Sequence, residues 1–181
     1  MDRNGQLGLI AFFAQQVGPT NHFGRKALQK LVHIATDFVG VPTGYQFSFY
    51  TYGPYSQALA SDLELAEQLL GIVSKRDETS GAFDIKAGPL ANKLIEISHS
   101  QLSNQMTNLN WTVENFGKLT AKSLELYSTL IFLRNNNSSY DSQPQDLFSQ
   151  VIKLKPKYDI NEIEVSYKKL IELEKTLQPL Q

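Results

Sequence analysis

The sequence predicts a mainly helical protein with a minor β component: a winged helix-turn-helix-like N-terminal half with a short β-hairpin, then an all-helical C-terminal half. Two observations predict this class. Three segments with helical spacing of apolar residues precede two short strand patterns, and after the polar stretch 98–110 only helical spacing remains. We therefore divide the chain into residues 1–98 and 99–181. Because single domains commonly hold roughly 100 to 200 residues, we expect one cooperative unit.

The first two predicted helices differ in polarity. The apolar run from Leu7 to Val17 predicts a core helix that ends at Gly18-Pro19. Residues 24–39 predict an amphipathic helix. Its apolar stripe is Leu28, Leu31, Val32, Ala35, Phe38 and Val39. Its polar stripe, which we expect to face solvent, is Lys26, Gln29, Lys30, His33 and Asp37.

An aromatic segment follows, in which Tyr45, Phe47 and Phe49 alternate with polar residues as in a half-buried strand. The Gly53-Pro54 pair predicts a turn after this strand. Ser56 is expected to cap a helix that continues to Leu70.

The end of the first half predicts a hairpin. Gly71 is expected to end the preceding helix as a left-handed cap. Strands are predicted at Ile72–Arg76 and Ala82–Lys86, joined by a loop at 77–81. A further helix is predicted over Pro89–Ile97.

The second half predicts helices near Trp111–Leu119 and Leu124–Leu133, with a break at 135–139. Two capping boxes indicate further helix starts. These are Ser142 with Gln145 before Leu147–Leu154, and Asp159 with Glu162 before Ile163–Leu177.

Composition excludes several classes of function. The chain has no cysteine, which rules out disulfides and thiolate metal sites and suits the cytoplasm. No apolar segment approaches the length of a membrane span, and the run at Leu7–Ala14 lacks the features of a signal peptide. The net charge of −1 lacks the basic excess of a dedicated nucleic-acid binder.

No metal, cofactor or catalytic site is predicted. The three histidines, His22, His33 and His99, have no metal-binding spacing, and the common nucleotide-binding and nucleophile motifs are absent. One arrangement remains open for an enzyme: Asp37 follows His33 by four residues, where a carboxylate can orient an imidazole. An exposed surface pair is the simpler interpretation.

Binding to DNA is an alternative that the predicted winged helix raises. The helix from Ser56 to Leu70 would normally enter the major groove, yet it carries three carboxylates, Asp62, Glu64 and Glu67, and no basic residue. Phosphate contacts would instead come from Arg25, Lys26, Lys75 and Arg76. DNA binding is therefore disfavoured.

Binding to another protein is the leading hypothesis. Tyr50 and Tyr52 lie on the face of the strand opposite to its core residues, and amphipathic tyrosines suit protein interfaces. The predicted contact residues are Tyr50, Tyr52, Gly53, Pro54, Tyr55 and Ser56, with Gln29 and His33 on the polar face of the second helix. Packing of the turn against that helix is the competing structural explanation. A homodimer is a further expectation, since symmetric dimers are the commonest oligomers.

Two segments carry a resemblance to known families. Ala27-Leu-Gln-Lys-Leu-Val-His-Ile-Ala35 and the segment Tyr45 to Ser56 resemble the Panacea, or SocA-like, antitoxin domain and the YwgA-like proteins. The resemblance covers Arg25–Val73, and Leu124–Leu170 is similar to the YwgA-like tail. It implies a non-enzymatic antitoxin or adaptor whose partner is a toxin or regulated protein. His33 replaces a common aromatic, and a basic recognition helix is lacking.

Overall fold

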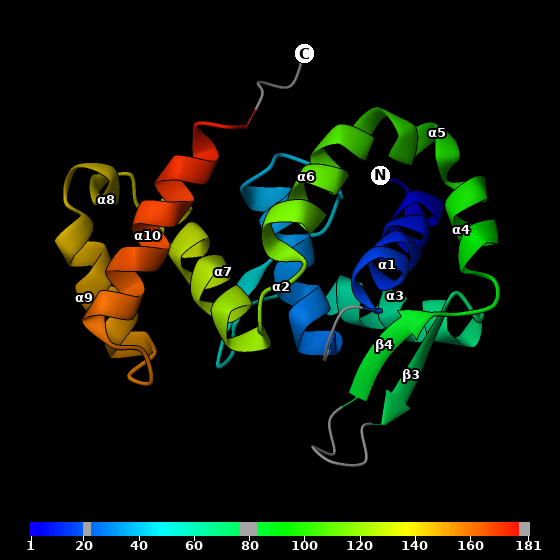
Figure 1. Ribbon diagram of the computed structural model, residues 1–181, viewed down its shortest axis with the longest axis horizontal. Coiled ribbons are helices and arrows are strands. Elements are labelled where there is room, and N and C mark those ends of the chain that lie inside the picture. Colours follow the sequence, from blue (N-terminus) through cyan, green and yellow to red (C-terminus); the bar gives the residue numbers. More distant parts are fainter. Residues whose placement is uncertain (20–22, 77–82, 178–181) are drawn as a thin grey trace.

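The computed structural model describes residues 1–19, 23–76 and 83–177, and it confirms a mainly helical fold with a minor β component (Figure 1). The helices are α1 (Arg3–Val17), α2 (Arg25–Asp37), α3 (Gln57–Gln68), α4 (Ala91–Ile97), α5 (His99–Leu102), α6 (Met106–Phe116), α7 (Ala121–Asn136), α8 (Ser139–Ser142), α9 (Pro144–Leu154) and α10 (Ile160–Glu174), with a 3₁₀ turn at Ser103–Gln105. The strands are β1 (Ser48–Tyr50), β2 (Gly53–Tyr55), β3 (Ile72–Arg76) and β4 (Phe83–Ala87), which form two antiparallel hairpins. His22 and the predicted loop 77–81 lie outside the described residues. The winged-helix identity stays a prediction.

Helices α2, α6 and α7 occupy the middle of the molecule in Figure 1, with α1, α4 and the β3–β4 hairpin at one end and α8, α9 and α10 at the other. One continuous hydrophobic core contains residues from both predicted halves. This core does not mark a boundary between the halves, and the division at residue 98 stays a prediction. In the part of the chain that the structure describes, no helix has the length and apolarity that a membrane crossing requires.

Helix α1 is the apolar core helix that its sequence predicts, and Asp2 begins it by accepting a hydrogen bond from the Gly5 amide (3.0 Å). The helix packs closely on α4. Gly8 permits this approach, because a Cβ there would overlap the Ser98 hydroxyl. The packing fixes one wall of the core against which α2 lies.

Helix α2 is buried on all sides, so the prediction of a solvent-facing polar stripe is wrong for most of it. Every residue from Ala27 to Ala35 is buried, including Gln29, Lys30 and His33. Helix α7 and strand β2 pack against the side that was expected to be exposed, where Ser128 contacts His33 and the Pro54 carbonyl accepts from Lys30. The buried polar groups are retained because they find partners on these neighbours.

The aromatic segment forms a short hairpin instead of a strand followed by a Gly-Pro turn. Only Ser48–Tyr50 of the predicted strand is extended in a ladder, and Gly53 and Pro54 belong to the second strand, with Phe49 opposite Pro54. The turn is at residues 51–52, and Gly53 has a positive φ of 81°. The predicted alternation nevertheless holds from Tyr45 to Tyr50, since the polar positions and Tyr50 are the more exposed.

Helix α3 begins at the predicted cap, where Ser56 Oγ accepts from the Leu59 amide (3.4 Å). Its end differs from the prediction. Leu70, not Gly71, takes the left-handed conformation, with φ of 56°. Gly71 is instead required by close packing, because a Cβ there would overlap Leu94. The β3–β4 hairpin follows as predicted, and its second strand ends one residue later, at Ala87. The predicted strand start at Ala82 lies outside the described residues.

The second half is helical in the described residues, and the polar stretch 98–110 is itself helical in most of its length. Asp159 caps α10 as predicted by accepting from the Glu162 amide (2.8 Å). The Ser142 cap is wrong: its hydroxyl donates to the Ser139 carbonyl within α8 (2.9 Å). Helix α9 begins instead with Pro144, which needs no partner for an amide hydrogen.

Candidate functional site

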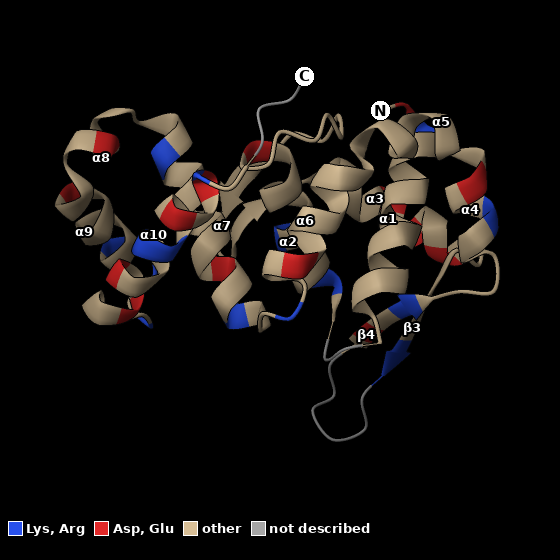
Figure 2. Ribbon diagram, turned by 45° about the horizontal axis from the view of Figure 1, so that its top comes forward, with Lys and Arg blue, Asp and Glu red and all other residues tan. Residues whose placement is uncertain are grey.

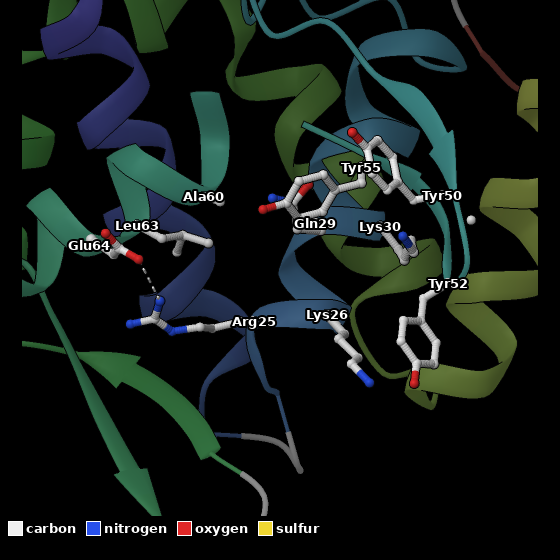
Figure 3. A pocket seen from close by; sticks show the side chains of 11 residues that line it. Arg25, Lys26, Gln29, Lys30, Tyr50, Tyr52, Tyr55, Ala60, Leu63 and Glu64 are labelled. Atoms are coloured by element: carbon white, nitrogen blue, oxygen red, sulfur yellow. Dashed lines mark ion pairs between the residues drawn. The ribbon is translucent and has the colours of Figure 1, made fainter. Parts of the chain in front are cut away.

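The candidate site is a pocket of about 230 Å³ between the hairpin at residues 48–55, the first turns of α2, and α3. We call this pocket the tyrosine pocket, and we call the hairpin at residues 48–55 the tyrosine hairpin. The pocket is lined by Arg25, Lys26, Gln29, Lys30, Tyr50, Tyr52, Gly53, Tyr55, Ala60, Leu63 and Glu64 (Figure 3). Several of the predicted contact residues of the hairpin thus border one concave surface, together with basic residues of α2.

Two tyrosines of the hairpin stand largely in solvent. The exposed fraction is 61% for Tyr50 and 54% for Tyr52. The Tyr50 ring packs edge-on against the Tyr55 ring, with centroids 5.5 Å apart. The Lys26 ammonium lies 3.7 Å from the centroid of the Tyr52 ring, a cation–π geometry. Both exposed rings therefore have defined positions beside the pocket (Figure 3).

Gln29 and Ser56 lie beneath this surface and do not face solvent. The Gln29 side chain donates to the Ser56 carbonyl (2.9 Å) and accepts from the Ser56 amide (3.0 Å). Both residues are buried. This two-way hydrogen bond fixes the chain at the point where the hairpin ends and α3 begins. Both residues thus have a structural role, and their role as direct contacts stays a prediction.

Buried lysines hold the hairpin from below. Lys30 donates to the Pro54 carbonyl, and Lys155, which follows α9, donates to the Thr51 carbonyl. Lys155 also pairs with Glu125 of α7 (2.8 Å), whose second oxygen accepts from Lys157 (2.8 Å). Residues from three distant parts of the chain thus meet under the tyrosine hairpin.

The electrostatics of this cluster follow from burial. Burial lowers the pKa of Lys30 to about 8, and the positive charges of Lys155 and Lys26 act in the same direction, while Glu125 opposes them. For Glu125, burial alone would raise the pKa of the carboxyl. The hydrogen bonds from Lys155 and Lys157 outweigh this effect and lower it. At pH 7 the Glu125 carboxyl is therefore ionised and Lys30 keeps its proton.

His33 is buried in the core. It does pair with Asp37 as predicted, but the prediction that the pair is exposed is wrong for His33. Its Nδ1 lies 3.0 Å from the Ser128 hydroxyl, and its Nε2 lies 3.2 Å from Asp37 Oδ2. The ring also packs edge-on against Phe47. Burial lowers the pKa of His33, although Asp37 opposes the shift. The arrangement stabilises a neutral imidazole inside the protein and keeps it from contact with a partner.

The residues assigned to the DNA alternative fall into two groups. Arg25 pairs with Glu67 (2.7 Å) and Glu64 (3.8 Å) of α3, while Lys75 and Arg76 lie on β3 (Figure 2). One of the three carboxylates of α3 does not face solvent. Asp62 is buried, where it accepts from the Tyr45 hydroxyl (3.0 Å) and pairs with Arg3 (3.3 Å).

Sequence reasoning missed the buried cluster of Lys30, Glu125 and Lys155. Two weak signals were present. Glu125 interrupts the apolar spacing of α7, and Lys155 follows directly on an apolar helix end. Neither signal identifies its partner, because the three residues are far apart in sequence. Among the described residues, no group of three or more histidines and carboxylates is placed to hold a metal ion.

Comparison with known proteins finds a relative that aligns with most of the chain. No family model matches the chain. The chain is similar to the uncharacterized protein YwgA of Bacillus subtilis (strain 168), with 25% identity over 150 residues. The aligned region covers 83% of this chain and 86% of the relative. The likeness extends over nearly the whole fold and supports a YwgA-like family for this chain.

Proposed function

We propose that the protein is a non-enzymatic, protein-binding adaptor or antitoxin-like regulator of the cytoplasm, and that the tyrosine hairpin is its contact surface. The observation that carries this proposal is the pair of largely exposed rings, Tyr50 and Tyr52, on a hairpin whose backbone is held by buried side chains. Aromatic residues are enriched at protein interfaces and among the residues that dominate binding energy.

The rigidity of the hairpin favours binding. Lys30, Lys155 and Gln29 hold backbone groups on both sides of the tyrosines. A surface that is already ordered loses less conformational entropy when a partner binds. The Tyr52 ring is further positioned by the Lys26 ammonium. Packing of the turn alone would not require exposed rings that are held in place by these contacts.

The size of the tyrosine pocket also supports a protein partner. Sites that enclose a drug-sized molecule commonly have volumes of about 300–1,000 Å³. At about 230 Å³, the tyrosine pocket is better matched to a side chain that projects from a partner. The resemblance of Ala27–Ala35 and Tyr45–Ser56 to Panacea antitoxin domains favours a toxin or another regulated protein as that partner.

The test is affinity capture from the native cell lysate at low salt, with and without nuclease, using the wild type and Tyr52→Ala. We expect a stoichiometric protein with the wild type and at least a tenfold loss with the variant. Phe83→Ala is the matched control, because Phe83 is also 54% exposed but lies on β4. Equal loss in both variants, or a large drop in the melting temperature of Tyr52→Ala, would return Tyr52 to a packing role.

The capture also distinguishes other classes. Nucleic acid that is lost at high salt would indicate a DNA-binding regulator that uses Lys75 and Arg76. Recovery of a second, untagged copy of the chain would indicate a homodimer. Either result, without a stoichiometric protein partner, contradicts the proposed adaptor function.

A further inference from the structure

We infer that the tyrosine pocket receives the carboxylate of a glutamate or aspartate side chain of the partner, between the ammonium groups of Lys26 and Lys30. This inference rests on the proposed function, because it names the chemistry by which the same surface would recognise its partner. It follows from the balance of charge in the pocket, the hydrogen-bonding capacity of the two lysines and the nature of the pocket walls.

The pocket has an excess of positive charge. Its lining contains Arg25, Lys26 and Lys30 but only one carboxylate, that of Glu64. Arg25 is already paired with Glu64 and Glu67. Within the described ranges 1–19, 23–76 and 83–177, neither Lys26 nor Lys30 has an ion-pair partner, and the carboxylate of Glu125 is engaged by two other lysines. Two ammonium groups therefore remain without a direct ion-pair partner.

Lys30 is the more unusual of the two. Its exposed fraction is 3%, and its ammonium donates to a neutral acceptor, the Pro54 carbonyl. An ammonium group has three donors, so donors remain for a ligand. A buried charge without a counter-ion is costly, and the pKa lowered to about 8 reflects that cost. An incoming carboxylate would supply the missing charge.

The two lysines border the same pocket. Lys26 and Lys30 are four residues apart on α2 and therefore share one helix face, and both line the pocket (Figure 3). Ala60 and Leu63 supply apolar walls that would contact a methylene stem, while Tyr52 covers the Lys26 side. An acidic side chain has a short apolar stem and a terminal carboxylate. It therefore matches a pocket with apolar walls and two ammonium groups.

The test uses the purified full chain and two small probes, N-acetyl-glutamate N′-methylamide and the corresponding glutamine compound, followed by NMR chemical shifts at pH 7. We expect the acidic probe to shift signals of the tyrosine hairpin and α2 with millimolar affinity, as suits a single side chain. The glutamine probe should bind at least fivefold more weakly. Equal binding of both probes, or none, overturns the inference.

Variants assign the binding to the two lysines. Lys26→Met changes an exposed side chain and should weaken the acidic probe at least fivefold, while Lys30→Met should abolish its binding. Lys118→Met is the control, because this exposed lysine lines a different pocket. Binding that survives both pocket variants contradicts the inference. Inorganic phosphate provides a further comparison: if it binds as well as the acidic probe, the site takes anions in general and the carboxylate assignment is wrong.

Dependence on pH gives a readout that a purely structural role would not produce. The charged groups around Lys30 are Glu125, Lys155 and Lys26. Because Lys30 must be protonated to bind, affinity for the acidic probe should fall about tenfold from pH 7 to pH 9, as expected for a pKa of about 8. An unchanged affinity contradicts the role of Lys30.

The probe-binding test and the capture test can fail independently of each other. Binding of the acidic probe without capture of a protein would leave the site in place and remove the adaptor function. Capture of a protein through Tyr52, without binding of the probe, would retain the adaptor function and overturn the carboxylate site.

Discussion

Replacing the buried Lys30 by methionine should stabilise the protein at neutral pH. Burial lowers the Lys30 pKa from 10.5 to about 8, and this difference corresponds to about 3 kcal/mol at pH 7. Methionine removes that cost. It also leaves the Pro54 carbonyl without its donor, which costs roughly 1–2 kcal/mol. We therefore expect the unfolding free energy of Lys30→Met to exceed that of the wild type by roughly 1–2 kcal/mol at pH 7.

The sign of the pH dependence gives a second, independent measurement. Between about pH 8 and pH 10.5 the unfolded wild type binds a proton at Lys30 that the folded state has lost. The unfolding free energy of the wild type therefore rises with pH in this window. By pH 9.5 the rise attributable to Lys30 is about 2 kcal/mol, whereas Lys30→Met lacks it.

Urea denaturation of both proteins at pH 7 and pH 9.5 tests this reasoning, since other titrating groups contribute to both proteins and largely cancel in the difference. We expect the advantage of Lys30→Met at pH 7 to be lost at pH 9.5. A stability difference that does not change with pH would show that Lys30 is not held in an unfavourable charged state. That result would remove the electrostatic reason for a carboxylate at this site.

Three further substitutions and one control test the fold. Glu125→Gln should lower the unfolding free energy by about 3 kcal/mol in urea denaturation, because it leaves the buried Lys155 ammonium without its carboxylate; a loss below about 1 kcal/mol would contradict this. Gly8→Ala should lower it by about 1–3 kcal/mol, because the added methyl group overlaps a hydroxyl at the end of α4, and an unchanged melting temperature would refute the close packing. Asp159→Ala should cost about 1 kcal/mol through loss of the α10 cap, while Ser142→Ala, at a serine that caps no helix, should be nearly neutral.

Local patterns predicted most of the secondary structure because local interactions determine it. The apolar spacing of α1 and the Ser56 and Asp159 caps each depend on residues within a few positions of one another. The Gly53-Pro54 pair misled the prediction, since its usual turn role was overridden by pairing of Pro54 with Phe49. The left-handed position falls on Leu70, and Gly71 is needed because packing against Leu94 leaves no room for a side chain there.

The candidate site could be predicted only in part. The exposure of Tyr50 follows from alternation along the strand, whereas Tyr52 is exposed at the turn of residues 51–52. The burial of Gln29, Lys30 and His33 does not, because an amphipathic pattern shows which side chains are polar and not whether another helix will cover them. Helix α7 supplies that cover from about 95 residues away, as the contact between His33 and Ser128 shows. Such long-range pairing leaves little trace in a single sequence.

The most direct test of the central proposal is the equilibrium affinity of the captured, purified partner for the wild type, Tyr52→Ala and Phe83→Ala, with melting temperatures measured on the same samples. The proposed contact surface predicts that Tyr52→Ala weakens binding at least tenfold with little change in melting temperature, while Phe83→Ala binds like the wild type. Unchanged affinity of Tyr52→Ala would contradict a partner-binding role for the tyrosine hairpin.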